Sequence, residues 1–551
     1  MTRDRARDGF LLLLFALLIL SALSAVRGTM VERADFTFTN NTEVQSLDPA
    51  TVSGVPEGRV LRGLFEGLTV EHPKTLEPLP GMAESWTVSE DGQTLRFRIR
   101  AEACWSDGRP LTAEDFVWSW KRLLQPRTAA KYYELLFYVK GAKSYFAAMG
   151  AWEKAGAEEA KRPSFDSVGI RAPESHLFEV ELSSPVPFFL SLTSFYPLFP
   201  VPRHVVEGHG RDWHRPGSLV NNGPFLLQQR TLRDRIRMTR NPRYWDRDRV
   251  KIETIDVLPV ESLVSALNLY LSGDVDWIPD VPATVLAELS GREDFQSSPY
   301  LGVYFYRINM QNKDPVKRRF FGDLRVRQAL ALTIDRAAIC RSVTRAGEIP
   351  AYDLTPPGLG AYSGPQIPRE DSEKAKSLLA AALADLGLEK APSFTILYNT
   401  HELHKDIAEV VQSQWSRKLG LDVRLENQEW GSYMTSMQSL GYDVARSAWI
   451  GDYPDPNTFL DMWTKGNTNN RTGWTRPEFD ALLARANHES DAAKRLSLLA
   501  EAEAMILSDL PVIPIYYYVT KNMVRPGVQG FYPNVLNVHP LKFLWMQKPS
   551  K

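Results

Sequence analysis

Alternation of apolar and polar residues predicts β-strands at several places along the chain. Residues 35–39 (DFTFT) place Phe at every second position and then enter a loop. Residues 85–100 (SWTVSEDGQTLRFRIR) alternate on both sides of an Asp-Gly turn, which is typical of a β-hairpin. Three further strands are predicted at residues 394–400, 421–430 and 442–450.

Runs with helical spacing separate these strands. Thr112 precedes one such run, and Asp115 three positions later completes a capping box. Residues 324–339 (LRVRQALALTIDRAAI) predict a second amphipathic helix, and residues 401–419 predict a third. Strands that alternate with helices favour an α/β architecture.

The strand predicted at residues 442–450 ends in an unusual way. Its apolar run Ala448-Trp449-Ile450 is followed by Gly451 and then by Asp452, and Tyr453-Pro454-Asp455-Pro456 stops the strand. One interpretation is an Asp that caps the next turn. The other is a desolvated carboxylate that receives a cationic ligand.

Length and charge limit the class of protein. A chain of 551 residues exceeds the roughly 250–300 at which a single core stops growing, so at least two cores are expected. The composition, 44% hydrophobic and 24% charged, is that of a globular protein, and no internal repeat is present. With a net charge of −1 and no basic cluster, nucleic acid is not expected as a partner.

The first residues have the layout of a secretory signal peptide. Three Arg precede the apolar run 10–20, and small residues follow it, so residues 1–28 are predicted to direct the protein to the periplasm. The apolar stretch 10–25 is short for a membrane span of about 20 residues, and an uncleaved anchor is the alternative. No Cys lies near the cleavage region, which disfavours a lipid anchor.

Motifs of catalysis are absent from the sequence. It has neither a G-x-S-x-G elbow nor a phosphate-binding loop, and His401-Glu-Leu-His404 has the wrong spacing for a zinc protease. Cys104 and Cys340 cannot build a zinc site alone, and two separate buried thiols are favoured over a disulfide. We therefore expect neither an enzyme nor a cofactor or metal.

Seven stretches, in order, together resemble one family. They are SLDPATVSGVPEGRVLRGLFEGL, GMAESWTVSEDGQTLRFRIRAEACWSDGRPLTAEDFVWSWKRLL, NNGPFLL…RNPRYWD, DLRVRQALALTIDR, LYNTHELHK, LENQEW and YDVARSAWIGDYPDPNTFL. The chain is similar to the periplasmic solute-binding proteins of peptide importers driven by an ATP-binding cassette, and most of all to the oligopeptide-binding members. The resemblance covers nearly the whole mature chain.

The resemblance implies a bilobal α/β fold, periplasmic-binding-protein-like, with two mixed-sheet lobes, a hinge and an extra subdomain. Lobe I would combine residues 29–75, 190–301 and 521–551. The extra subdomain (II) would be residues 76–189, and lobe III residues 302–520. The lobes would close over the ligand by hinge motion.

The resemblance also implies roles for single residues. Asp452 matches the family Asp that pairs with the α-ammonium of a bound peptide. The peptide backbone would be contacted by two segments: Gly54, Val55, Pro56 and Glu57, and Arg446, Ser447, Ala448 and Trp449. Pockets and the peptide C-terminus would be served by Trp430, Tyr300, His404 and Arg446. For Arg446 and His404 a structural salt bridge and an N-cap neighbour remain alternatives, as does core packing for Trp449.

This sequence departs from the family pattern at three places. A family arginine falls on Met437, and a family lysine falls on Thr344, next to Arg345. A family cysteine bridge is replaced by Gly302 and Ile450. These changes leave the preferred peptide length open.

The function that follows is a monomeric periplasmic receptor that binds small peptides and delivers them to an inner-membrane ABC permease. A relative that takes murein peptide, a sugar or a nickel chelate is one alternative, and a secreted hydrolase is another.

Overall fold

Three sheets organise the protein, whose computed structural model describes residues 32–359, 361–489 and 491–547. The predicted signal peptide lies outside the described residues. In spatial order the first sheet is β12 (Phe295–Gln296), β19 (Asn522–Val524), β11 (Trp277–Ile278), β1 (Phe36–Thr39), β10 (Thr254–Leu258), β9 (Arg235–Arg240) and β8 (Phe225–Thr231). The second is β14 (Ile349–Pro350), β18 (Val512–Val519), β13 (Pro299–Ile308), β17 (Val444–Ile450), β15 (Phe394–Asn399) and β16 (Val423–Gln428). The third is β4 (Ala83–Val88), β5 (Thr94–Ile99), β7 (Leu177–Glu181) and β6 (Ile170–Glu174).

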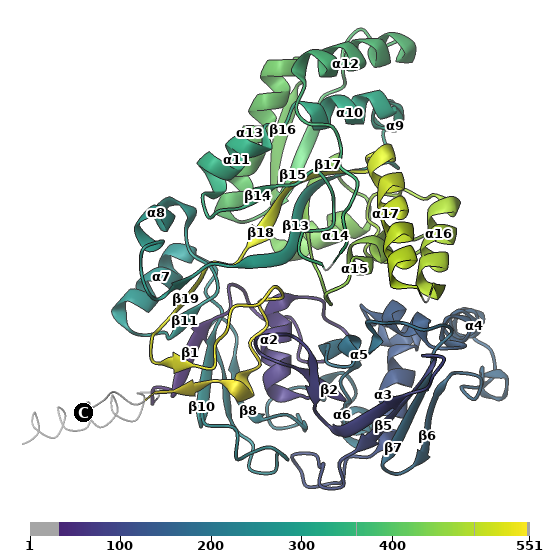
Figure 1. Ribbon diagram of the computed structural model, residues 1–551, viewed down its shortest axis with the longest axis vertical. Coiled ribbons are helices and arrows are strands. Elements are labelled where there is room, and N and C mark those ends of the chain that lie inside the picture. The colour runs from purple at the N-terminus through teal and green to yellow at the C-terminus, as the bar shows by residue number, and fades with distance from the viewer. Residues whose placement is uncertain (1–31, 360, 490, 548–551) are drawn as a thin grey trace, which may run out of the picture.

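These sheets form two bodies, one above the other in Figure 1. The lower body holds the first and third sheets, two small ladders of β2 (Thr69–Glu71) with β3 (Pro78–Pro80) and β20 (Val528–Gln529) with β21 (Trp545–Met546), and helices α2 (Val55–Leu64), α3 (Ala113–Leu123), α4 (Ala142–Ala155), α5 (Phe189–Leu192), α6 (Arg203–His209), α7 (Leu263–Ser272) and α8 (Leu286–Leu289). The upper body holds the second sheet and helices α9 (Pro315–Gly322), α10 (Leu324–Leu332), α11 (Arg336–Ile339), α12 (Ser372–Leu386), α13 (Glu402–Leu419), α14 (Trp430–Gln438), α15 (Asn457–Leu460), α16 (Pro477–His488) and α17 (Ala492–Asp509).

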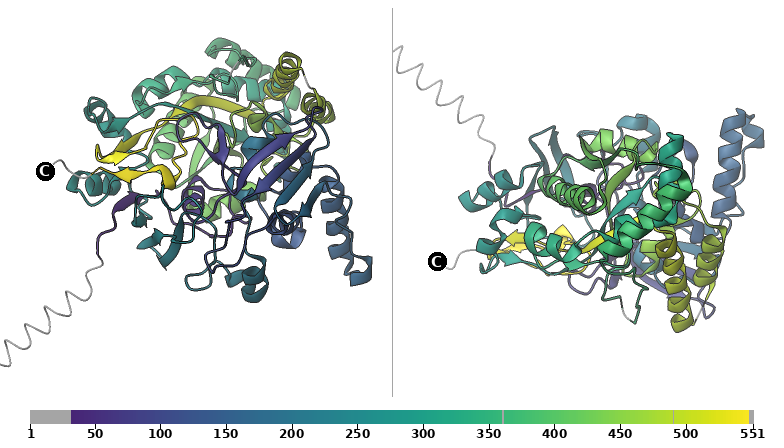
Figure 2. Two further views of the ribbon diagram at one scale, coloured as in Figure 1. Left: turned by 60° about the horizontal axis from the view of Figure 1, so that its bottom comes forward. Right: turned by 90° about the horizontal axis from the view of Figure 1, so that it is seen from above.

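The chain crosses between the bodies twice, after β12 and after β18. The yellow C-terminal segment returns from the upper sheet to the lower one, as Figures 1 and 2 show. The two crossovers are bonded to each other: the Thr520 amide donates to the Ser298 carbonyl at 2.8 Å, and their hydroxyls lie 2.9 Å apart. Two adjacent crossovers are the arrangement that a hinge requires. The exact domain boundaries given above stay a prediction.

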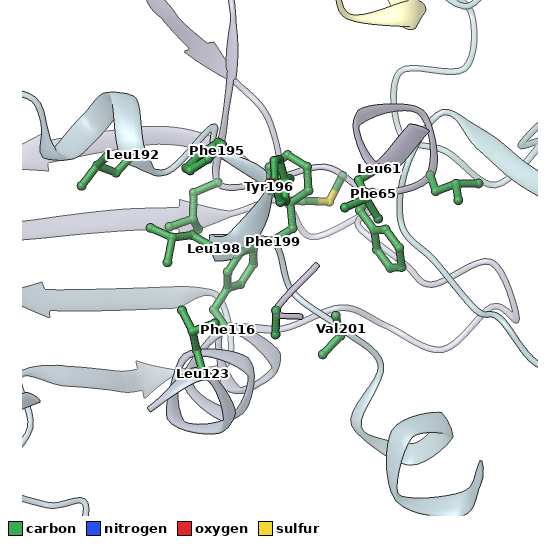
Figure 3. Packing of buried hydrophobic residues seen from close by; sticks show 14 of the residues in the cluster. Leu61, Phe65, Phe116, Leu123, Leu192, Phe195, Tyr196, Leu198, Phe199 and Val201 are labelled. Carbon is green, nitrogen blue, oxygen red and sulfur yellow. The ribbon is translucent and has the colours of Figure 1, made fainter. Parts of the chain in front are cut away.

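Each body has its own hydrophobic core. One cluster joins lobe I to the extra subdomain, and Figure 3 shows α2, α3 and the segment after α5 meeting in it. The labelled residues are Leu61, Phe65, Phe116, Leu123, Leu192, Phe195, Tyr196, Leu198, Phe199 and Val201. A second cluster, centred on β13, β17 and β18, fills lobe III. Because packed cores resist deformation, each body is expected to move as a unit.

Most predicted elements are confirmed, with two corrections. The capping box at Thr112 and Asp115 starts α3 as predicted. The helix predicted at residues 324–339 is instead two helices, because the Asp335 side chain accepts from the Ala338 amide at 2.8 Å and starts α11 anew. The strand predicted at residues 421–430 ends at Gln428, and Trp430 begins α14. Cys104 and Cys340 are both free, but only Cys340 is buried; Cys104 is partly exposed.

Candidate functional site

Strand β17 lies inside a sheet but has one incomplete edge. It pairs with β13 along its whole length, from Val444 opposite Ile308 to Ile450 opposite Gly302. On its other side β15 pairs only with Val444 and Ala445. In the described part of the chain, no strand therefore covers that edge from Arg446 onward. Strand residues alternate in direction, so the N–H and C=O groups of Ala448 and Ile450 face this free edge.

Two neighbouring contacts fix that direction. The Tyr433 hydroxyl, from α14, donates to the Arg446 carbonyl. The Gly451 amide donates to the Leu301 carbonyl on β13 at 2.8 Å. Arg446 and Gly451 thus point to opposite sides of the strand, five positions apart, as a regular strand requires.

Asp452 lies just beyond the end of β17, as the sequence predicted. Its amide donates to the Thr458 hydroxyl at 3.1 Å, and the Tyr132 hydroxyl lies 3.4 Å from its carboxylate. Among the described residues no Lys or Arg forms an ion pair with it. Burial raises the pKa of Asp452 well above its ordinary value; the nearby charge of Asp461 adds to the rise, and Tyr132 and Arg62 oppose it. A carboxylate in this state gains strongly from a cationic partner.

Arg446 lies on β17, six positions before Asp452, and 9% of it is exposed. Its guanidinium donates to Asn399 Oδ1 at 3.2 Å and to the Tyr518 hydroxyl at 3.1 Å, and it lies over the Tyr304 ring at 5.0 Å. Within the described residues no carboxylate pairs with it, and its Nε has no hydrogen-bond partner. Its predicted alternative, a structural salt bridge, is therefore not what the structure contains.

His404, in the first turn of α13, is buried beside Arg446. Its ring centroid lies 5.7 Å from that of Tyr304. Burial lowers the pKa of His404 well below its ordinary value, and the charge of Arg446 lowers it further. The free edge of β17 thus has an unpaired carboxylate at one end and an unpaired guanidinium with a neutral imidazole at the other.

The remaining predicted residues lie in different settings. Trp430 is 41% exposed and stacks on Tyr433 at 5.6 Å, while Tyr300 lies edge-on to Tyr518 at 6.2 Å. The Ser447 hydroxyl accepts from Arg307 at 3.0 Å and is occupied inside the protein. Trp449 is partly exposed and packs against the core of lobe III.

Gly54 to Glu57 are not all available for backbone pairing. Only Gly54 is extended, and the next three residues form the first turn of α2. The Gly54 carbonyl accepts from the Gly58 amide at 3.0 Å, Pro56 has no N–H, and the Pro56 carbonyl accepts from Asn40 at 3.0 Å. Contact with a ligand backbone through this segment stays a prediction, limited to the amides of Gly54, Val55 and Glu57.

The positions that depart from the family pattern are occupied by internal contacts. Met437 is fully buried, and the Thr344 hydroxyl donates to Glu348 at 2.7 Å. Gly302 and Ile450 are direct partners across β13 and β17, and a Cβ on Gly302 would lie 2.4 Å from the terminal methyl of Ile450.

Three tyrosines that surround this site were not predicted from the sequence. Tyr132 reaches Asp452 from the extra subdomain, 320 positions away in the chain. Tyr433 and Tyr518 contact Arg446 from α14 and from the end of β18. No local sequence motif marks these tyrosines, because each reaches the site from a different element; only the folded structure shows their hydroxyls next to Asp452 and Arg446.

The two bodies are in contact next to Asp452. The Tyr138 hydroxyl lies 3.4 Å from Asp461 and accepts from Nδ2 of the Asn457 side chain at 2.8 Å, and the Phe188 and Tyr453 rings stack at 4.3 Å. Burial raises the pKa of Asp461 to about 7, with the charges of Glu134 and Asp455 adding to the effect. We call Tyr138, Tyr453, Asn457 and Asp461 the interlobe latch.

Comparison with known proteins identifies the family. Residues 77–471 match the model of the bacterial extracellular solute-binding proteins, family 5 Middle. The chain belongs to this family. It is 39% identical over 503 residues to the periplasmic oligopeptide-binding protein OppA of Salmonella typhimurium. The aligned residues cover 89% of this chain and 88% of that protein. The members of this family are solute-binding proteins, and the predicted bilobal fold is confirmed.

Solved structures of family 5 proteins also resemble this one. Haemophilus influenzae OppA in complex with the peptide RPPGFSPFR superimposes with a TM-score of 0.85, at 31% identity, covering 94% of this chain and all of that one. The unliganded open form of the murein tripeptide binding protein MppA superimposes with a TM-score of 0.64, at 31% identity. That match covers 94% of this chain and 98% of the MppA chain. The arrangement of the two bodies here is thus closer to the peptide complex than to the open form, in agreement with the interlobe latch.

Two further observations concern membranes and metals. Across residues 32–359, 361–489 and 491–547, no helix combines the length and the apolar character needed to cross a membrane. In the same residues, no group of three or more His, Cys, Asp or Glu side chains is placed to hold a metal ion.

Proposed function

We propose that this protein is a periplasmic receptor that captures oligopeptides by their backbone and charged termini. It delivers them to an ABC permease of the inner membrane, and it acts as a monomer without catalysis. One observation carries the proposal: the free edge of β17 lies between the unpaired carboxylate of Asp452 and the unpaired guanidinium of Arg446. A zwitterion in extended form is the ligand that satisfies all three features.

The lengths are compatible. Asp452 lies six positions after Arg446, which corresponds to about 20 Å of extended chain at roughly 3.3 Å per residue. An extended peptide adding to the free edge would bond to Ala448 and Ile450, as in β-augmentation. Backbone bonds do not read side chains, so one receptor accepts many sequences.

The relatives support the peptide class. The Salmonella relative is named for oligopeptides, and the Haemophilus structure holds a nonapeptide. A neutral sugar would leave both Asp452 and Arg446 without a counter-charge, and a nickel chelate that carries one net charge would leave one of the two without it. Because unpaired buried charge is costly, these alternatives are disfavoured.

Thermal unfolding with a panel of di- to hexapeptides tests the function. At about 100-fold excess over Kd, a bound ligand stabilises the folded protein by about 2.7 kcal/mol, which raises the melting temperature measurably. Native mass spectrometry of protein purified without denaturation is expected to show co-purified peptides. The proposal would be overturned if no peptide of the panel raised the melting temperature at millimolar concentration while nickel or a disaccharide did. Mass spectra of the recovered peptides would reveal cleavage if the protein were a hydrolase.

A further inference from the structure

His401 lies beside the cationic end of the site and has no role assigned so far. It is the N-cap residue of α13, and its ring centroid lies 4.5 Å from that of His404. Its side chain does not cap the helix, so in the described residues the first-turn amides of this 18-residue helix lack a side-chain acceptor.

Unpartnered nitrogens gather here. Nδ1 of His401, Nδ1 of His404 and Nε of Arg446 are all buried without a hydrogen-bond partner in the described chain. His404 and Arg446 are 8% and 9% exposed. Buried polar atoms in native proteins are rarely left unsatisfied, so three in one place indicate a ligand with acceptor oxygens.

The local charge favours an anion over a metal cation. Arg446 carries a fixed positive charge, Lys521 lies close by at the second crossover, and the N-terminal end of α13 adds a partial positive charge. Lys521 is bound to Glu348 at 3.1 Å, and the charges of Asp280 and Glu402 also reach His401. The hydroxyl-bearing rings of Tyr304 and Tyr518 complete the surroundings.

We propose that His401 joins His404 and Arg446 in one anion subsite for a peptide carboxylate, and that the two imidazoles take up a proton from solvent when the carboxylate binds. The inference rests on the proposed function and deepens it.

The empty and bound states of the subsite differ in charge. Burial lowers the pKa of both His401 and His404, and the charge of Arg446 lowers the pKa of each further, so both rings are neutral at pH 7 before binding. A carboxylate next to the rings compensates Arg446 and favours imidazolium. Because the bound-state pKa is then the higher one, affinity is greatest at low pH and falls as pH rises through that value. Uptake of one proton corresponds to a change of about tenfold in Kd per pH unit.

The test compares a free-acid peptide with its C-terminal amide. The peptide used is the tightest binder of the di- to hexapeptide panel. Both forms have the same α-ammonium, so any proton that Asp452 releases cancels in the difference. Calorimetry in buffers of different ionisation enthalpy counts the protons, and we expect the acid to take up more protons than the amide. A second pair, ending in Glu-amide and Gln-amide, shows whether a side-chain carboxylate serves as well as the C-terminal one.

Variants assign the proton to the subsite. His401→Asn keeps a polar side chain that does not titrate, and we expect it to reduce the acid-minus-amide proton count and flatten the pH dependence of Kd. His209→Asn, at an exposed histidine of α6, is the matched control and should behave as wild type. If His401→Asn fails to fold, His401→Gln and the NMR imidazole shifts of the wild-type protein, with and without peptide, replace it.

The outcomes separate the two proposals. Equal proton counts for acid and amide, with both bound, would overturn the subsite and leave the peptide receptor intact. An unchanged difference in His401→Asn would remove His401 from the subsite. Failure of every peptide to bind would overturn both.

Discussion

Asp452 and Arg446, an acid and a base, have no ion-pair partner within the described chain, and they lie at the two ends of one free strand edge. Some buried charges are paired within the protein: Arg495 binds Asp455 at 2.8 Å, and Lys542 binds Glu66 at 2.8 Å. A buried charge without a partner costs free energy unless a ligand supplies the counter-charge. Buried Arg307 also has no carboxylate partner, but it is held by the Ser447 hydroxyl and the Asn469 carbonyl, whereas Nε of Arg446 has no partner in the described chain.

Asp452→Asn tests the role of that carboxylate. The variant keeps the size of the side chain and removes its charge, so peptide affinity should fall by about 2–5 kcal/mol. N-acetylation of the peptide should cost wild type a similar amount, and the two losses should not add, because both remove the same ion pair. Calorimetry on the four combinations measures this.

The control for this cycle is Asp406→Asn, at an exposed acid of α13, which should leave the acetylation penalty unchanged. Additive losses for Asp452→Asn would mean that the carboxylate is structural and that the peptide N-terminus is held elsewhere. If Asp452 only caps a turn, Asp452→Asn would instead lower the free energy of unfolding by about 1 kcal/mol.

Strands β13 and β17 fit together through one glycine. Gly302 lies opposite Ile450, and the side chain of Ile450 occupies the space that a Cβ at position 302 would need. The Tyr518 ring lies at 3.1 Å from the same point. The register of the two central strands, and with it the position of Asp452, therefore depends on a small residue opposite a large one.

Gly302→Ala should lower the melting temperature, by an amount that corresponds to roughly 1 kcal/mol, because overpacking forces Ile450 to rotate. Gly302→Ala combined with Ile450→Ala should destabilise less than the sum of the two single changes, since the smaller residue restores the space. Gly322→Ala, where a Cβ meets open space, is the matched control and should show no loss. Additive effects of the two changes would contradict the proposed fit.

The whole molecule is two rigid bodies joined by two adjacent crossovers and closed by the interlobe latch. The two large cores lie in different bodies, whereas Tyr138 comes from the extra subdomain and Asp461 from lobe III. Opening therefore breaks the polar contacts of the latch and the stacking of Phe188 on Tyr453. To close the protein, the ligand needs to supply only the free-energy difference between the open and the closed state.

Closure should depend on pH through Asp461. Burial raises its pKa to about 7 in the closed form, and exposure on opening would return it toward its ordinary value. The protonated acid thus favours closure: this contribution is fully present below the open-state pKa and is lost as pH rises through about 7. Small-angle X-ray scattering of the ligand-free protein should show a larger closed fraction at pH 5.5 than at pH 8.

Asp461→Asn should reduce this difference, because the amide has no proton to lose; Asp452, whose pKa burial also raises in the closed form, supplies the remainder. Asp406→Asn should keep the wild-type profile. A closed fraction that changes with pH equally in all three proteins would show that the latch does not titrate, and that another group controls closure.

The sequence by itself determined the local elements and the family. Alternation and capping located β1, the β4–β5 hairpin, α3 and the strand before Asp452, because these signals act within a few residues. Ordered motifs along the chain led to the bilobal fold and to Asp452, Arg446 and His404. The sequence also pointed to Gly54–Glu57 but did not indicate that three of these residues start a helix.

Only the tertiary structure decided which charges are paired and which groups meet. The free edge of β17 depends on where β15 stops pairing, and the contacts of Tyr132, Tyr433 and His401 join segments with no shared local pattern. Burial of Asp461 arises only when two bodies close. Pairing and desolvation are properties of surroundings assembled from distant parts of the chain, so no window of sequence contains them.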